Sequence, residues 1–155
     1  MLPFTVCPVG DTGLLVSFEQ RIAQSVGAAV AALNTRVAAA AIPGVVETVP
    51  AFASLLIFYD PLVTVYDAVA AAVQKLAQAP GSDTAAEEGR LVEIPVCYGG
   101  TFGPDLPFVA EHAGLTEKEV IELHAGREYR IYMLGFLPGF PYLGGLDERL
   151  FTPRL

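Results

Sequence analysis

One stretch without a large apolar side chain divides this chain in two. Residues 80–90, PGSDTAAEEGR, begin with Pro-Gly and continue with small, polar and charged residues. Such a segment cannot contribute to a hydrophobic core, and Pro and Gly interrupt helices and strands, so we predict a linker here. We therefore expect two domains, 1–79 and 91–155. The 155 residues are 53% apolar, which is enough to bury a core and excludes general disorder.

The first domain alternates between short β-rich runs and longer Ala-rich segments. Strands are predicted at 4–9, 13–18, 45–49 and 55–59, and helices at 21–41 and 65–79. Apolar residues recur at steps of three and four in both helices, which is typical of one buried face. They are Ile22, Val26, Val30, Leu33 and Val37 in the first helix, and Val65, Val69, Val73 and Leu76 in the second. Thr64 and Asp67 resemble a capping box. This order predicts an α+β fold, a two-layer sandwich with both helices on one face of an antiparallel sheet.

The second domain shows shorter elements and an irregular end. We predict a strand at 91–96, a Gly-rich loop at 98–104, helices at about 105–112 and 116–124, and a strand at 128–134. The sequence Thr116-Glu117-Lys118-Glu119 is a clear capping box for the second of these helices. The tail, residues 135–155, is rich in Gly, Pro and aromatic residues, so we expect no regular element to continue there for long.

Three features could carry chemistry. The Gly-rich loop precedes a helix, where backbone amides can bind phosphate, but it lacks the spacing and the Lys of a phosphate loop, and a plain turn is the alternative. His124 is a better functional candidate than His112, because it leads into the strand before the tail. The tail is either one wall of a small-molecule pocket or a loop packed by its own aromatic rings.

Other residue types give weaker signals. Cys7 and Cys97 are too few for a disulfide framework or a CxxC metal site, so we expect two small buried hydrophobic residues and no metal. Asp105 and Asp147 both flank Gly/Pro loops, which leaves a pair of catalytic carboxylates open.

Charge and hydropathy exclude several classes of protein. Nine Lys and Arg against seventeen Asp and Glu give a net charge of −8 and no basic stripe, so we expect no nucleic-acid partner. No apolar run reaches the roughly 20 residues of a membrane helix, and the N-terminus has no basic segment before an apolar one. We therefore expect a cytoplasmic protein with no membrane partner.

A family resemblance rests on the tail. The run YMLGFLPGFPYLGGL at 132–146, followed by Thr152-Pro153-Arg154, resembles the signature of the 5-oxoprolinase B-subunit family, which includes the kinase inhibitor KipI and allophanate hydrolase subunit 1. The segments IPVCYGGTFGPDL at 94–106, LTEKEVIELH at 115–124 and PGVVETVPAF at 43–52 extend the resemblance along nearly the whole chain.

The resemblance implies a cyclophilin-like β-barrel for the second domain. Family members continue past the Thr-Pro-Arg element with more strands, so we expect an incomplete barrel in a C-terminally truncated chain. They often carry an acidic residue where Thr101 stands, so a carboxylate role is not carried over to that position.

The resemblance also implies one component of an enzyme complex. With the homologous C subunit and with the A subunit, it would convert 5-oxo-L-proline to L-glutamate in an ATP-dependent reaction, and it would be inactive alone. We expect this chain to bind no cofactor itself, because it has no Walker loop and ATP is used by the complex. Two alternatives stay open: a KipI-like inhibitor of a sporulation histidine kinase, and a carboxyltransferase or allophanate hydrolase subunit 1 in urea metabolism.

By resemblance the site lies in the second domain. His124 would be the catalytic residue, as a proton donor or acceptor, and Arg154 would pair with a substrate carboxylate. The Gly and Pro residues would shape the pocket, and the aromatic rings would cover an apolar ring edge. The predicted substrate-binding residues are Tyr98, Gly99, Gly100, Tyr132, Gly135, Phe136, Pro138, Gly139, Phe140, Tyr142, Gly144, Gly145 and Arg154.

Overall fold

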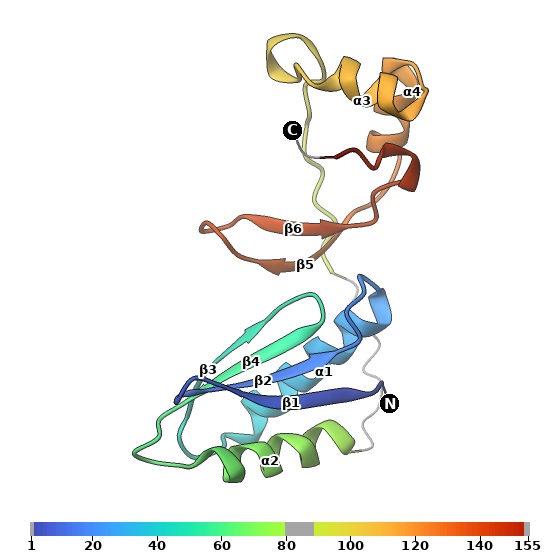
Figure 1. Cartoon of the computed structure of the whole chain (residues 1–155). Coiled ribbons are helices and arrows are strands. Elements are labelled where there is room, and N and C mark those ends of the chain that lie inside the picture. The colour runs from blue at the N-terminus through green and yellow to red at the C-terminus, as the bar shows by residue number, and fades with distance from the viewer. Residues whose placement is uncertain (1, 80–88, 154–155) are drawn as a thin grey trace. The chain divides into compact units, whose positions relative to one another are not determined.

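The chain divides into two compact units, Met1–Gly89 and Arg90–Leu155 (Figure 1). A computed structural model describes residues 2–79 and 89–153. The predicted linker therefore lies outside the described residues except for its last two positions. Among the described residues, no helix combines the length and the apolar character that crossing a bilayer requires.

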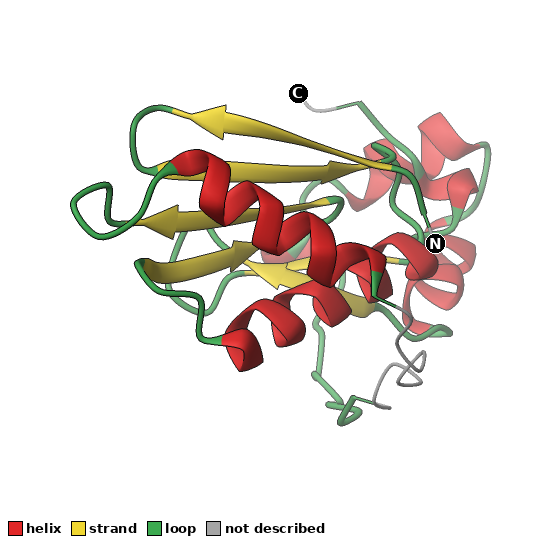
Figure 2. Ribbon diagram, turned by 90° about the horizontal axis from the view of Figure 1, so that it is seen from below, coloured by secondary structure: helices red, strands yellow, loops and turns green. Residues whose placement is uncertain are grey.

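The first unit is a four-stranded antiparallel sheet covered by two helices. Its elements are β1 (Phe4–Val9), β2 (Gly13–Phe18), α1 (Gln24–Ala40), β3 (Val45–Pro50), β4 (Ser54–Tyr59) and α2 (Tyr66–Gln78). The strands lie in the order β1-β2-β4-β3, so each hairpin contributes one central and one edge strand. Figure 2 shows both helices crossing the same face of the sheet. The predicted α+β sandwich is confirmed.

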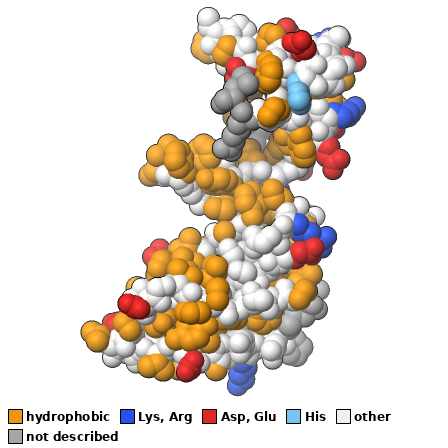
Figure 3. All heavy atoms as spheres, viewed as in Figure 1, with side chains coloured by type: hydrophobic (Ala, Val, Ile, Leu, Met, Phe, Trp, Pro, Cys, Tyr) orange, Lys and Arg blue, Asp and Glu red, His pale blue; other side chains and the backbone are white. Residues whose placement is uncertain are grey.

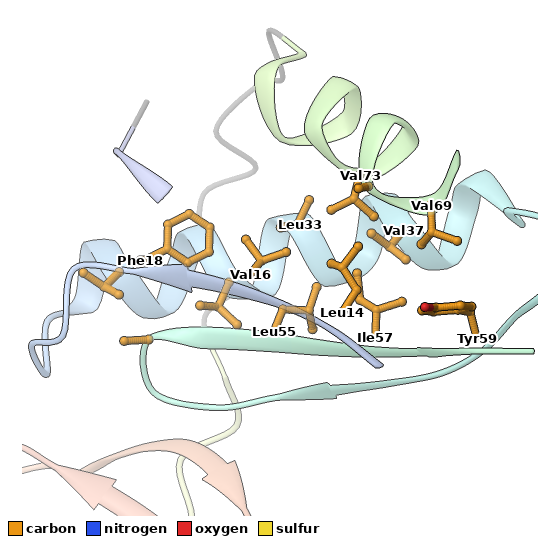
Figure 4. Packing of buried hydrophobic residues seen from close by; sticks show 14 residues of the cluster. Leu14, Val16, Phe18, Leu33, Val37, Leu55, Ile57, Tyr59, Val69 and Val73 are labelled. Atoms are coloured by element: carbon orange, nitrogen blue, oxygen red, sulfur yellow. The ribbon is translucent and has the colours of Figure 1, made fainter. Parts of the chain in front are cut away.

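The core of this unit lies between the sheet and the helices (Figure 4). Alternate side chains of the two central strands are buried, because only one face of each strand points toward the helices. The buried residues are Leu14, Val16 and Phe18 of β2, Leu55, Ile57 and Tyr59 of β4, Val26, Val30, Leu33 and Val37 of α1, and Val69, Ala70 and Val73 of α2.

The predicted helix faces are wrong at their first residues. Ile22 and Val65 are each 63% exposed, because α1 begins at Gln24 and α2 begins at Tyr66. The predicted capping box at Thr64 is also wrong, since Val65 is the N-cap residue and makes no side-chain capping hydrogen bond. Cys7 and Cys97 are exposed rather than buried. Cys7 lies on edge strand β1, where a side chain can face solvent.

The second unit is smaller and mixes helices with one hairpin. It contains a 3₁₀ turn at Gly100–Phe102, α3 (Leu106–Ala113), α4 (Glu117–Ala125), β5 (Arg130–Leu134), β6 (Pro141–Gly144) and a 3₁₀ turn at Glu148–Leu150. Strands β5 and β6 pair antiparallel, and within residues 90–153 they form an open two-stranded sheet rather than a closed barrel.

A small core holds this unit together. Ala110 of α3, Val120 of α4 and Leu150 of the last 3₁₀ turn are buried against one another. The tail therefore folds back on the helices of its own unit. This contact positions the end of α4, which carries His124.

One prediction for this unit is wrong. Residues 91–96 form no strand and are exposed, and no described strand pairs with them. The tail forms one short strand, β6, because its residues 141–144 find a partner in β5, which agrees with the expectation that no regular element continues there for long. Helix α3 begins at Leu106, and the side chain of its N-cap residue, Asp105, makes no capping hydrogen bond.

Candidate functional site

The Gly-rich loop of the second unit positions Tyr98. Gly99 and Gly100 have φ angles of 76° and 55°, in the left-handed region that glycine adopts without strain. The amide of Gly103 donates to the carbonyl of Gly99 at 3.0 Å, and a Cβ on Gly103 would lie 2.7 Å from the Gly99 nitrogen. Of the two interpretations of this loop, the structure matches the turn, which directs the chain from Tyr98 into α3.

His124 lies in the last turn of α4 and contacts two tyrosines. The hydroxyl of Tyr98 lies 2.6 Å from Nδ1 of His124, and the two rings meet edge to face. The hydroxyl of Tyr129 donates to the backbone carbonyl of His124 at 2.9 Å, and its ring centroid lies 5.3 Å from that of the imidazole. All three side chains are half-buried. Burial raises the pKa of Tyr129 above its ordinary value.

The start of α4 is fixed by the predicted capping box, which is confirmed. The hydroxyl of Thr116 accepts from the amide of Glu119, and the Glu119 carboxylate accepts from the amide of Thr116 at 2.8 Å. The hydrogen bonds to Thr116 lower the pKa of Glu119. Local sequence therefore determines where this helix begins and, through its length, where His124 lies.

Asp147 is engaged with arginines and is not a free carboxylate. Its Oδ1 and Oδ2 accept from Nε and Nη2 of Arg149, each at 2.9 Å, and Nη1 of Arg127 lies 3.8 Å from Oδ2. The hydrogen bonds from Arg149 and the charges of both arginines hold the pKa of Asp147 well below its usual range. A carboxylate that two arginines hold in its charged form is a poor general acid or base near neutral pH.

The tail motif forms the loop that joins β5 to β6. The amide of Leu137 donates to the carbonyl of Gly135 at 2.8 Å, which makes a tight turn centred on Phe136, whose φ is +66°. The amide of Phe140 then donates to the carbonyl of Leu137 at 3.0 Å. Pro138 and Gly139, with φ +78° at Gly139, occupy the central positions that a type II turn favours for these residue types.

The aromatic residues of this hairpin pack on one another. The ring centroids of Phe136 and Phe140 are 5.9 Å apart, and those of Phe140 and Tyr142 are 5.4 Å apart, both edge to face. Phe136 is nevertheless 83% exposed. Figure 3 shows hydrophobic side chains gathered over β5 and β6. A positive φ at an exposed phenylalanine is strained, and such outliers tend to persist at functional sites.

The predicted site residues fall into two groups. Tyr98 contacts His124, and Gly99 and Gly100 form the turn that follows Tyr98. The larger group forms the hairpin: Tyr132, Gly135, Phe136, Pro138, Gly139, Phe140, Tyr142 and Gly144, with Gly145 directly after it. Arg154 lies outside the described residues. An open hollow, lined by Leu2, Pro3, Phe4, Gln74 and Gln78, lies in the first unit and contains none of the predicted residues. The described residues hold no group of three or more His, Cys, Asp or Glu that could bind a metal ion.

Sequence reasoning missed Tyr129. The residue lies just before β5, and its surroundings in the sequence indicate only a strand. One local signal could have indicated it: Gly126 ends α4, and a chain that turns directly after a helix can return an aromatic residue to the last helical turn. The contact between Arg127 and Asp147 had no comparable signal, because these two residues are far apart in the sequence.

The chain belongs to the family of carboxyltransferase domains, subdomains C and D, whose family model matches residues 4–155. Within this family it is similar to proteins named as the B subunit of 5-oxoprolinase. The protein from Bacillus subtilis (strain 168) is 40% identical over 156 residues, covering 94% of this chain and 65% of the relative. The one from Escherichia coli O157:H7 is 47% identical over 114 residues, covering 72% of this chain and 50% of the relative. The chain therefore spans between half and about two thirds of the length of these relatives.

Solved structures show a similar fold. The crystal structure of TTHA0988 matches with a TM-score of 0.73 at 36% identity, covering 92% of this chain and 27% of that one. The Kluyveromyces lactis urea carboxylase matches with a TM-score of 0.63 at 15% identity, covering 90% of this chain and 14% of that one. At that identity the second likeness concerns the fold alone.

Proposed function

We propose that this chain is the B subunit of a 5-oxoprolinase and works with the A and C subunits to convert 5-oxo-L-proline to L-glutamate at the expense of ATP. The observation that carries this proposal is the 40% identity over 156 residues to a protein with that name. Two further relatives with the same name, at 47% and 43% identity, support it.

The proposed site lies in the second unit, around His124. Opening the lactam ring breaks an amide bond, which requires polarisation of the carbonyl and a proton for the leaving nitrogen. His124 is the proposed catalytic residue, because its imidazole can donate or accept a proton. Arg154 is proposed to pair with the substrate carboxylate, and the hairpin rings of Phe136, Phe140 and Tyr142 to cover the apolar edge of the substrate ring.

The exposed surface of the hairpin supports a partner-dependent site. Ile131, Leu134 and Leu137 are each more than half exposed, beside Phe136. A cluster of exposed apolar side chains of this kind marks an interaction site. In the proposed complex a neighbouring protein covers this cluster and completes the site, which is why the chain alone is expected to be inactive.

The alternative functions have weaker support. The likeness to urea carboxylase is at 15% identity and bears on the fold alone. No comparable observation favours inhibition of a histidine kinase.

The test is reconstitution. The chain is co-produced with the A and C subunits from the same genome, and the complex is isolated by size-exclusion chromatography. ATP hydrolysis and glutamate formation are then measured with 5-oxo-L-proline, with urea in its place, and without substrate. A complex without this chain is the control, and the Bacillus subtilis relative serves as the reference protein. Co-elution with 5-oxoproline-dependent turnover is expected. Failure to co-elute, or turnover only with urea, would overturn the proposal.

A further inference from the structure

Tyr98 contacts a ring nitrogen of His124 through its hydroxyl, in addition to the edge-to-face contact between the two rings. The phenol oxygen lies 2.6 Å from Nδ1, at the short end of hydrogen-bond distances for a hydroxyl. Tyr98 is positioned for this contact by the turn at Gly99 and Gly100 that follows it. The contact joins the segment before α3 to the last turn of α4.

The chemistry of the two groups decides which one donates. A phenol hydroxyl is a strong donor, and the unprotonated nitrogen of a neutral imidazole is a strong acceptor. The tautomer of a histidine is determined by the hydrogen bond made at one of its two nitrogens. We infer that Tyr98 donates to Nδ1 and holds neutral His124 in the tautomer that carries its proton on Nε2, so that Tyr98 is a positioning residue rather than a contact to the substrate.

Tyr129 restrains the same histidine from another side. Its hydroxyl donates to the backbone carbonyl of His124, and its ring lies beside the imidazole. This bond orders the end of α4 but touches neither ring nitrogen. Tyr129 therefore fixes where the imidazole is, whereas Tyr98 fixes which nitrogen carries the proton.

The consequence for the site rests on the proposed function. Among the described residues, none hydrogen-bonds to Nε2 of His124. In the inferred tautomer Nε2 carries an N–H that can donate to a ligand, and the matching acceptor in a lactam is the carbonyl oxygen. His124 thus donates a hydrogen bond to a substrate carbonyl and stabilises the charge that develops on its oxygen, instead of removing a proton as a general base.

The first test reads the tautomer in the chain without any assay of activity. Long-range ¹⁵N–¹H NMR spectra of the imidazoles are recorded about two pH units above the ordinary imidazole pKa, with His112 as the internal reference. We expect His124 to show a protonated Nε2 and an unprotonated Nδ1, and Tyr98→Phe to convert it to a mixture of tautomers. Tyr129→Phe is the matched control. It also removes a tyrosine hydroxyl that bonds to His124, but the bond lost is the one to the backbone carbonyl, so we expect the tautomer to stay unchanged. A protonated Nδ1 in the wild-type chain, or an unchanged tautomer in Tyr98→Phe, would overturn the inference.

The second test uses the reconstituted complex. The side-chain amide of His124→Gln can place an N–H near the position of Nε2, whereas His124→Asn and His124→Ala cannot. We expect His124→Gln to retain at least about tenfold more activity than either, since one such donor contributes about 10²–10³ in rate. Tyr98→Phe should lower kcat with less than a twofold change in KM. An equal loss of activity in all three His124 variants, or a rise in KM alone in Tyr98→Phe, would contradict the inference. A complex with no 5-oxoproline turnover would count against the proposed function, while the tautomer remains readable in the spectra.

Discussion

Asp147 accepts from both Nε and Nη2 of Arg149, with one hydrogen bond of 2.9 Å to each carboxylate oxygen. This bidentate pair, with Arg127 at 3.8 Å, ties the segment after α4 to the last 3₁₀ turn of the second unit. Leu150, which completes the small core, belongs to that turn. The contact between Arg127 and Asp147 therefore links this turn of the tail to the segment that follows α4.

The pH dependence of this pair has a definite sign. The pKa of Asp147 in the folded chain lies below its value in the unfolded chain. Its contribution to stability is therefore fully present above the ordinary Asp pKa of about 3.9 and is lost as the pH falls below that value. We expect Asp147→Asn to destabilise the second unit near neutral pH, with a difference from wild type that shrinks below about pH 4.

Urea unfolding at several pH values, followed by NMR signals of the second unit, measures this difference. Asp105→Asn is the control, because the side chain of Asp105 makes no capping hydrogen bond, and its effect should stay below about 0.5 kcal/mol. A gap between wild type and Asp147→Asn that is the same at acidic and neutral pH would contradict the expectation.

The catalytic assignment predicts a difference between the two histidines. His124→Ala in the reconstituted complex should lower kcat by about 10²–10³, the effect of losing one hydrogen-bond donor to a developing oxyanion. His112→Ala should leave kcat within about twofold, because His112 is exposed and its ring stacks on Phe108 of the same helix. Steady-state kinetics measure both effects. If the kcat of the His124→Ala enzyme stayed within about twofold of wild type, His124 would have no catalytic role.

The turn before β3 requires glycine for two reasons. Gly44 has φ +84°, and a Cβ there would lie 2.6 Å from Cγ2 of Thr64. Gly10 has φ +59° but has open space around it. Both Gly→Ala variants should cost about 1–2 kcal/mol for the left-handed backbone, and Gly44→Ala should cost more because Thr64 must also move. Urea unfolding of the first unit compares the free energy of unfolding of the two variants. An equal loss in both would show that the contact with Thr64 is unimportant.

The capping box of α4 predicts a local loss of stability. Thr116→Ala removes the acceptor for the Glu119 amide and should cost about 1 kcal/mol, whereas Thr116→Ser keeps the hydroxyl and should cost little. Amide hydrogen exchange along α4 reports the change where it occurs. If the alanine and serine variants exchanged alike, the hydroxyl would have no capping role.

The loop residue Phe136 combines strain with exposure. Glycine adopts φ +66° freely and a β-branched residue does not, so Phe136→Val should destabilise the hairpin relative to Phe136→Gly by about 1–3 kcal/mol. Both variants lose the exposed ring, so both should lose activity in the complex. Hydrogen exchange at the Gly135 amide measures the first effect and the reconstitution assay the second. Full activity in Phe136→Gly would show that the ring is not part of the site.

Short-range patterns determined much of the fold. The stripe of Val26, Val30, Leu33 and Val37 indicated the buried face of α1, because residues three and four apart lie on one side of a helix whatever surrounds it. The capping box at Thr116 indicated the start of α4, because both of its partners lie within one turn. The tail motif indicated the family without any knowledge of contacts.

Tertiary structure alone decided the rest. Residues 91–96 have the composition of a strand and form none, whereas residues 141–144 contain Pro and Gly and form β6. A strand needs a hydrogen-bonding partner, and among the described residues the second segment has one and the first does not. The bond between Tyr98 and His124, and the pairing of Arg127 with Asp147, likewise join residues from different segments. The sequence by itself determined what each segment prefers within a turn or two, while the packing of distant segments decided which side chains meet, because such contacts depend on the path of the whole chain.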